Sequence, residues 1–211
     1  MLDDPKDHSR LVLIRHPLLA DPYCRQALGQ AEAELARRGR SQWLKVMQSL
    51  DGIAIDRVFA APVAQTSEPA QALAGDRELE WEKDPRLLDQ DLGDWEGRLW
   101  EEIRAEDPEA LRSFFLSFGT AAAPGGESLS EALDRIREWW EDLREEVFEK
   151  TVAVVAGGHL LQGFAAFLLG LGLNRAPALA MPPGAIGILD VYQDGAVCRT
   201  WHPLCLSDEM P

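Results

Sequence analysis

The sequence has little cysteine and little positive charge. Its 211 residues include three cysteines, Cys24, Cys198 and Cys205, an odd number without the close spacing of zinc ligands. This pattern implies neither a disulfide framework nor a zinc site. Lysine and arginine total 21 against 36 aspartates and glutamates, so the formal net charge is −15. Because nucleic acids and anionic membranes bind basic surfaces, we expect neither as a partner.

Long apolar runs and export signals are also lacking. Residues 1–10 are polar and acidic, without the basic and apolar regions that a secretory signal needs. The most apolar stretch, 160–173, contains Gln162 and several glycines. It is shorter than the run of about 20 residues that spans a bilayer. We interpret it as a buried helix and predict a cytoplasmic protein, in keeping with the few cysteines.

Short apolar runs alternate with helical patterns along the chain. Runs at 10–15, 57–61 and 151–156 predict buried strands, and 185–192 and 196–201 flank Asp194-Gly195 as in a β-hairpin. Apolar spacing predicts helices at 35–50, from Pro62 onward, at 99–105, 108–118 and 128–150, and from His159 onward. The alternation predicts an α/β fold, a three-layer α/β/α sandwich with a mostly parallel central sheet.

The domain organisation follows from the absence of internal repeats and linkers in the sequence. We expect one domain over residues 10–206, preceded by an N-terminal extension at 1–9 and followed by a C-terminal tail at 207–211. An apolar content of 46% is sufficient for a buried core in a domain of this size.

A histidine follows the first predicted strand. Arg15-His16 lies where the apolar run ends at Pro17, and open α/β sheets bind ligands beyond the carboxyl ends of their strands. An imidazole there can attack phosphorus, and the adjacent guanidinium can bind phosphoryl oxygens. A solvated surface pair is the ordinary alternative, so the dipeptide alone does not establish a phosphate site.

Five motifs in order along the chain extend this indication. They are Leu11-Val-Leu-Ile-Arg-His16, Leu35-Ala-Arg-Arg-Gly-Arg-Ser-Gln42, Val58-Phe-Ala-Ala-Pro-Val63, Arg86-Leu-Leu-Asp-Gln-Asp-Leu-Gly-Asp-Trp-Glu-Gly-Arg98 and Gly125-Gly-Glu-Ser-Leu129. Together they resemble the histidine phosphatase superfamily over roughly residues 10–202. The chain is most similar to the phosphoglycerate-mutase-like branch, and within it to α-ribazole-phosphate phosphatases.

The resemblance implies a phosphoglycerate-mutase-like fold and a two-step hydrolysis of phosphomonoesters without metal or cofactor. His16 matches the family's nucleophile and Arg15 its phosphate-binding neighbour. Asp89 matches the proton donor, although glutamate is commoner there, and an ordinary loop carboxylate is the alternative. The implied partner is a small phosphorylated metabolite, with a homodimer left open as the assembly.

Two groups of the family's pocket are replaced in this sequence. Gln65 stands where the second arginine is expected, and Gly157 stands where the second histidine is expected. Gln162 replaces an arginine that commonly follows. His159, two residues after Gly157, either enters the pocket as a substitute donor or caps the following helix and points elsewhere. With Arg15, we predict Gln65 and His159 as phosphate-binding residues.

The sequence leaves two functional hypotheses. The first is a phosphomonoesterase with a weakened pocket, since the loss of one oxyanion donor costs about 10²- to 10³-fold in rate. The second is a pseudophosphatase that binds a metabolite or a protein. A mutase is a weaker third, because its phosphohistidine must survive to return the phosphoryl group. The hydrolase leads because nucleophile, arginine and acid are all present. Other basic residues near the motifs are Arg25, Arg86 and Arg98.

Overall fold

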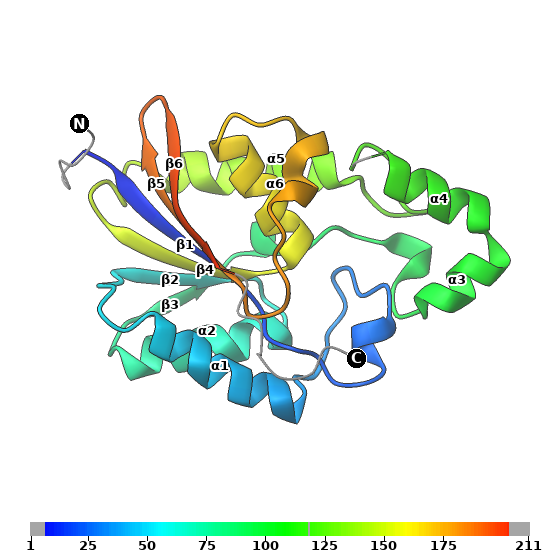
Figure 1. The fold of residues 1–211 in the computed structure, drawn as a ribbon, viewed down its shortest axis with the longest axis horizontal. Helices are drawn as coiled ribbons and strands as arrows, with labels where there is room; N and C mark the ends of the chain where they lie inside the picture. The colour runs from blue at the N-terminus through cyan, green and yellow to red at the C-terminus, as the bar shows by residue number, and fades with distance from the viewer. Residues whose placement is uncertain (1–6, 118, 203–211) are drawn as a thin grey trace.

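The computed structural model describes residues 7–117 and 119–202, and its centre is a mixed six-stranded sheet of order β3-β2-β4-β1-β5-β6 (Figure 1). The strands are β1 (Ser9–Arg15), β2 (Arg57–Ala60), β3 (Trp81–Lys83), β4 (Thr151–Ala156), β5 (Ile186–Tyr192) and β6 (Gly195–His202). Neighbours from β3 to β1 pair in parallel, whereas β5 runs antiparallel to both β1 and β6. The prediction of a mostly parallel sheet is confirmed.

Helices cover both faces of this sheet. α1 (Arg37–Ser49) and α2 (Ala64–Asp76) lie on one face, and α5 (Leu129–Leu143) and α6 (Gly158–Leu168) lie on the other (Figure 1). The central strand β1 packs against both layers: Val12 and Ile14 join the apolar cluster of α1 and α2, while Leu11 joins that of α5 and α6. Burial on both faces explains why β1 reads as a continuous apolar run, and it confirms the three-layer architecture.

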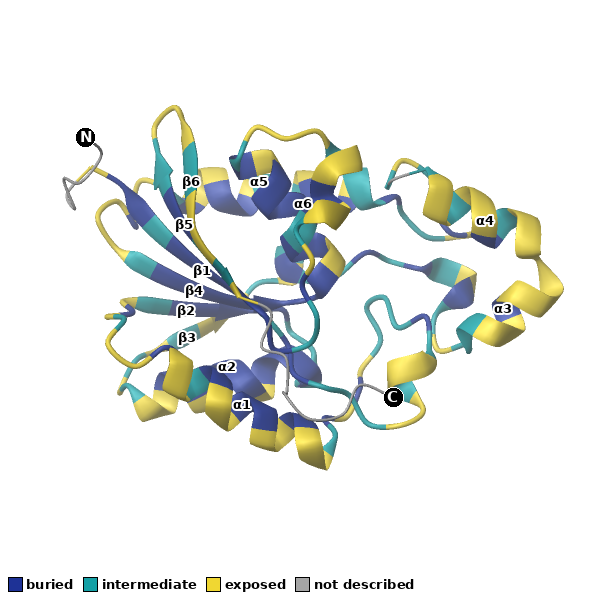
Figure 2. Ribbon diagram, in the orientation of Figure 1, coloured by how far each residue is buried: buried dark blue, intermediate teal, exposed yellow. Residues whose placement is uncertain are grey.

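A third, smaller cluster lies beyond the carboxyl ends of the parallel strands. It contains α3 (Trp100–Glu106) and α4 (Pro108–Leu116), whose outer surfaces are largely exposed (Figure 2). Short 3-10 turns connect the larger elements: η1 (Tyr23–Arg25), η2 (Pro85–Leu87), η3 (Gly93–Trp95) and η4 (Leu173–Ala178). Among the described helices, none combines the length and apolarity required to cross a bilayer.

The structure corrects several predicted boundaries. α2 begins at Ala64 rather than Pro62, because Val63 keeps an extended conformation with φ −119° and ψ 151°. The turn between β5 and β6 is Gln193-Asp194, and Gly195 already pairs with Tyr192 as the first residue of β6.

Other boundaries differ at the ends of elements. α5 ends at Leu143 instead of residue 150 and is followed by turns, with Glu149 at φ 63°. The helix expected over 160–173 ends at Leu168, and the short strand β3 was not predicted. Ser9, expected in an N-terminal extension, begins β1. The expected limits at 203–206 and 207–211, and Cys205, lie outside the described residues.

The connections around β1 and β4 place a crevice between them. These strands are neighbours, yet the chain leaves β1 toward α1 on one face and leaves β4 toward α6 on the other. At such a reversal the loops diverge and open a space at the carboxyl edge of the sheet. His16 follows β1 and Gly157 follows β4, so both residues lie at this crevice.

Candidate active site

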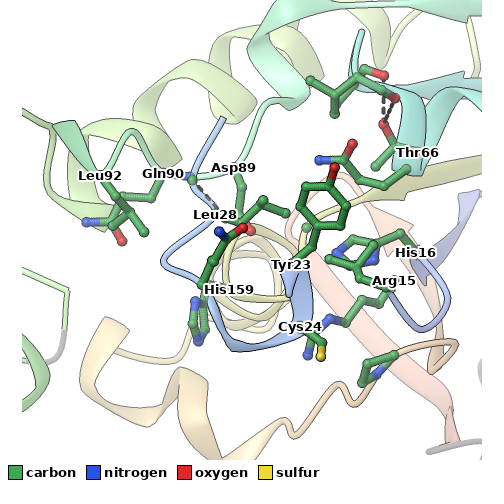
Figure 3. Close-up of a pocket in the computed structure, with 18 of the residues that line it drawn as sticks. Arg15, His16, Tyr23, Cys24, Leu28, Thr66, Asp89, Gln90, Leu92 and His159 are labelled. Carbon is green, nitrogen blue, oxygen red and sulfur yellow. Dashed lines mark hydrogen bonds between the residues drawn. The ribbon is translucent and has the colours of Figure 1, made fainter. Parts of the chain in front are cut away.

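The predicted site residues line one pocket at the crevice between β1 and β4 (Figure 3). Its cavity of about 220 Å³ is bordered by Arg15, His16, Gln65, Asp89 and His159, which come from four separate segments of the sequence. This volume is below the roughly 300–1,000 Å³ of sites for drug-sized ligands, so the pocket suits a small reacting group.

The imidazole of His16 is buried and held in one tautomer. Its Nδ1 lies 2.9 Å from the carbonyl of Pro17, which can only accept, so Nδ1 carries the hydrogen and Nε2 keeps its lone pair. Burial, and then the charge of Arg15, lower the pKa of His16 to about 4. The ring is therefore uncharged at neutral pH, with Nε2 unprotonated, as a nucleophile must be.

Arg15 lies beside His16 at the same edge of the pocket (Figure 3). Its Nη1 donates to the carbonyl of Met181 at 2.6 Å, which fixes the guanidinium. A Cβ on Gly158 would lie 2.8 Å from both Cδ and Nε of Arg15, so glycine is needed for this close approach. Burial lowers the pKa of Arg15 and the charge of Asp89 opposes that shift, which indicates that the two side chains are close.

Asp89 occupies the space beside Gly157. A Cβ on Gly157 would lie 2.8 Å from the Cβ of Asp89 and would overlap its carboxylate. The carboxylate also accepts from the backbone N–H of Gln90 at 3.0 Å. The glycine at the expected position of the second histidine thus makes room for the shorter acid, which lines the pocket from that side.

The loop that carries Asp89 is held from behind by two residues that the sequence analysis did not assign. Arg135 of α5 donates to the carbonyls of Leu88 and Asp89 at 3.2 and 3.3 Å, and it forms an ion pair with Glu127. Glu127 also accepts from the N–H of Asp91 at 2.9 Å. Glu127 lies in the Gly-Glu-Ser motif, but no local pattern distinguishes Arg135 from the other charged residues of α5.

Gln65 is buried in the pocket wall, and its amide is engaged with the backbone. Its Oε1 accepts from the N–H of Ala33 at 3.1 Å, and its Nε2 donates to the carbonyl of Ala31 at 2.9 Å. One amide hydrogen remains available for another acceptor. The prediction that Gln65 binds phosphate depends on this hydrogen.

His159 lies at the rim. It is exposed, and its ring is on the opposite side of the pocket from His16 (Figure 3). α6 has Gly157 as its N-terminal cap and no side-chain capping bond, so the interpretation of His159 as a helix cap is wrong. Its role as a hydrogen-bond donor to the phosphate remains a prediction.

Three further arginines named above, Arg25, Arg86 and Arg98, are engaged with carboxylates. Each forms ion pairs: Arg25 with Asp21, Arg86 with Asp84 and Asp142, and Arg98 with Glu106. Among the described residues that line the pocket, only Arg15 has a permanent positive charge.

Part of the pocket lining is apolar. Its larger apolar side chains are those of Leu18, Leu19, Leu28, Val63, Leu92, Trp100 and Phe114. Val63 and Leu92 lie in the motifs quoted above, and the others lie outside them.

Comparisons with known proteins show what this chain is similar to. The family model described as histidine phosphatase superfamily (branch 1) matches residues 11–203. A phosphoserine phosphatase 1 of Hydrogenobacter thermophilus is 28% identical over 166 residues, 79% of each chain. An adenosylcobalamin/alpha-ribazole phosphatase of Escherichia coli is 25% identical over 95% of this chain and 98% of its own. The crystal structure of the alpha-ribazole phosphatase from Shigella flexneri superposes with a TM-score of 0.83 at 23% identity, over 95% of this chain and all (100%) of that one.

Proposed function

Since this chain belongs to branch 1 of the histidine phosphatase superfamily, we propose that it hydrolyses small phosphate monoesters through a phosphohistidine on His16. The family predicted from the motifs is confirmed by the family model, and the phosphoglycerate-mutase-like fold by the superposed structure. The family and its phosphatase-named relatives support a phosphoric monoester hydrolase.

One observation carries the assignment of the nucleophile. Nδ1 of His16 donates to the carbonyl of Pro17, so the lone pair is on Nε2, and the low pKa of the ring keeps it there at neutral pH. Among the described lining residues, the guanidinium of Arg15 is the fixed charge beside this ring. A base of low pKa is a weaker nucleophile than an ordinary imidazole, but it needs no deprotonation before attack.

The proposed reaction has two displacements. Nε2 of His16 attacks phosphorus while Arg15 binds the phosphoryl oxygens, the ester P–O bond breaks, and the leaving oxygen takes the proton of Asp89. Water then attacks the phosphohistidine, its proton passes to the carboxylate of Asp89, and the N–P bond breaks to release inorganic phosphate and the neutral imidazole.

We further propose that the phosphate pocket is weakened. The amide of Gln65 is bonded to the backbone of Ala31 and Ala33, and Gly157 offers no side chain. Each lost donor to a developing oxyanion costs about 10²- to 10³-fold in rate. The same features favour the second candidate, a pseudophosphatase that binds a metabolite or a protein without turnover.

Turnover of p-nitrophenyl phosphate by the wild type and by His16→Ala separates the two candidates. We expect slow wild-type turnover, and a loss of about 10⁴-fold or more in the variant, because removal of a nucleophile disables the whole catalytic unit. Thermal unfolding of both proteins checks that the variant is folded. Equal, background-level rates in two folded proteins would contradict the hydrolase and favour the pseudophosphatase.

A further inference from the structure

The charges that line the pocket are few and nearly balanced. The lining has one permanent cation, Arg15, and one carboxylate, Asp89. The other titratable side chains of the lining, those of His16, His159, Tyr23 and Cys24, carry no permanent charge. The side chains thus supply a net charge of zero when Asp89 is ionised and of one positive unit when it holds the proton that it donates.

Two helices begin at the pocket, but only one leaves its positive end open to it. Gly157 and His159, at the start of α6, line the cavity, and a helix N-terminus contributes about half a positive charge. At the start of α2 the N–H of Ala64 is instead bonded to the carboxylate of Glu32 at 2.6 Å, which offsets that helix end. Together with the N-terminus of α6, the lining therefore carries a net charge of about +0.5 when Asp89 is ionised and about +1.5 when Asp89 is protonated.

Charged residues behind the lining do not add to this positive charge. Arg135 is paired with Glu127, and Arg25, Arg86 and Arg98 are paired with carboxylates. The whole chain carries a net charge of −15, so its long-range field repels anions rather than attracting them. A single negative charge falls within the range that the lining can balance, whereas a double charge exceeds it whether or not Asp89 is protonated.

The apolar part of the lining indicates the same conclusion independently. Leu28, Trp100 and Phe114 face the cavity, where a hydroxyl or an esterified oxygen is better accommodated than a second ionised one. Taking an uncompensated charge out of water costs several kcal/mol, and apolar side chains return none of it.

We propose that the substrate presents a singly charged phosphoryl group to His16, either as the monoanion of a phosphate monoester or as a phosphate diester with an apolar ester group. The proposal rests on the phosphohistidine chemistry proposed above and specifies the ionic form of the substrate that this chemistry accepts. For a diester, Nε2 displaces one alcohol, which takes the proton of Asp89, and the phosphohistidine keeps the other ester group. Water then releases a phosphate monoester and Asp89 recovers the proton.

The test compares three substrates across pH, with His16→Ala prepared in parallel as the background. An aryl phosphate and an alkyl phosphate differ in their second ionisation, which lies at about 6 for phosphate esters generally. A methyl aryl phosphate diester is singly charged throughout. The pH dependence of kcat/KM is measured for each substrate, so that an ionisation of the enzyme, common to all three, is distinguished from one that moves with the substrate.

We expect kcat/KM of each monoester to fall about tenfold per pH unit above its own second ionisation, and the two profiles to be displaced accordingly. Turnover of the diester at about pH 7.5 would identify a phosphate diester as the substrate, and its absence would identify the monoester monoanion. A kcat/KM that follows the dianion, or monoester profiles that coincide, would overturn the proposal and leave the phosphatase function intact. Rates equal to the His16→Ala background for all three substrates would overturn both.

Discussion

The closest test of the site's geometry is the substitution Gly157→Ala. A Cβ at this position would lie 2.8 Å from the Cβ of Asp89 and would overlap its carboxylate, so the acid must move. Gly157 itself has φ −71° and ψ 151°, a conformation that alanine adopts without strain. The substitution should therefore displace Asp89 while leaving the backbone in place.

The magnitude follows from the role proposed for Asp89. A displacement of a reacting group by about 1 Å costs about 10²-fold, and general acid catalysis as a whole contributes about 10²- to 10⁴-fold. We expect kcat/KM for an alkyl phosphate to fall about 10²-fold in Gly157→Ala. The loss should be smaller for p-nitrophenyl phosphate, because its leaving group departs without needing a proton.

The assay compares the two substrates in the wild type, Gly157→Ala and a matched control. Gly75→Ala in α2 is suitable, since a Cβ there meets nothing within 4 Å. We expect this control to keep wild-type kinetics, with stability unchanged or higher by up to about 1 kcal/mol. Asp89→Ala completes a double-mutant cycle in which Gly157→Ala should have little further effect on the rate.

Two results would refute this reasoning. One is a folded Gly157→Ala protein whose kcat/KM for the alkyl phosphate is within about twofold of the wild type. The other is an equal loss from Gly157→Ala with and without Asp89, since the effect would then not pass through the acid.

Four further predictions concern the same site and the opposite end of the sheet. Gly158→Ala would place a Cβ 2.8 Å from Cδ and Nε of Arg15, so kcat/KM should fall about tenfold or more, and an unchanged value would mean that the guanidinium does not bind substrate. Because the pKa of His16 is about 4, the acid limb of kcat/KM should lie near that pH, and a limb near 6.5 would contradict the burial argument. Between pH 4 and pH 6.5 the unfolded chain binds a proton at His16 that the folded chain does not bind, so the free energy of unfolding rises with pH over this range. Urea unfolding should show that this rise is smaller by about 3 kcal/mol in His16→Gln than in the wild type. Burial alone would raise the pKa of Asp190, but hydrogen bonds from two arginines hold it below its usual value. Its stabilisation is therefore present at neutral pH and lost in acid. Asp190→Asn should lower the free energy of unfolding by about 1–3 kcal/mol at pH 7, and a difference that does not shrink as the pH falls below the ordinary aspartate pKa of about 3.9 would contradict this.

Local sequence was sufficient to predict five of the six described strands and to propose His16 as the nucleophile. The run that forms β1 is apolar on both faces because helices cover both, and its end at Arg15-His16 marks the carboxyl edge where ligands bind. Asp89 could be proposed as the proton donor because its loop carries a motif. In each case a short stretch of chain determines the feature.

The rest depends on contacts between distant segments. The amide of Gln65 is used by Ala31 and Ala33, so its identity as a polar residue did not reveal that it is largely satisfied. The fit of Asp89 against Gly157 joins a loop to the end of β4. No periodicity or spacing encodes such pairs, because each depends on how the layers pack.

The most direct measurement of the central claim is rapid-quench labelling with a ³²P-phosphate monoester, followed by mapping of the labelled peptide. The account predicts a protein-bound phosphoryl group that is labile in acid, stable in base and located on His16, formed and consumed at rates consistent with turnover. Label on another residue, or repeated turnover with no label on the protein, would contradict it.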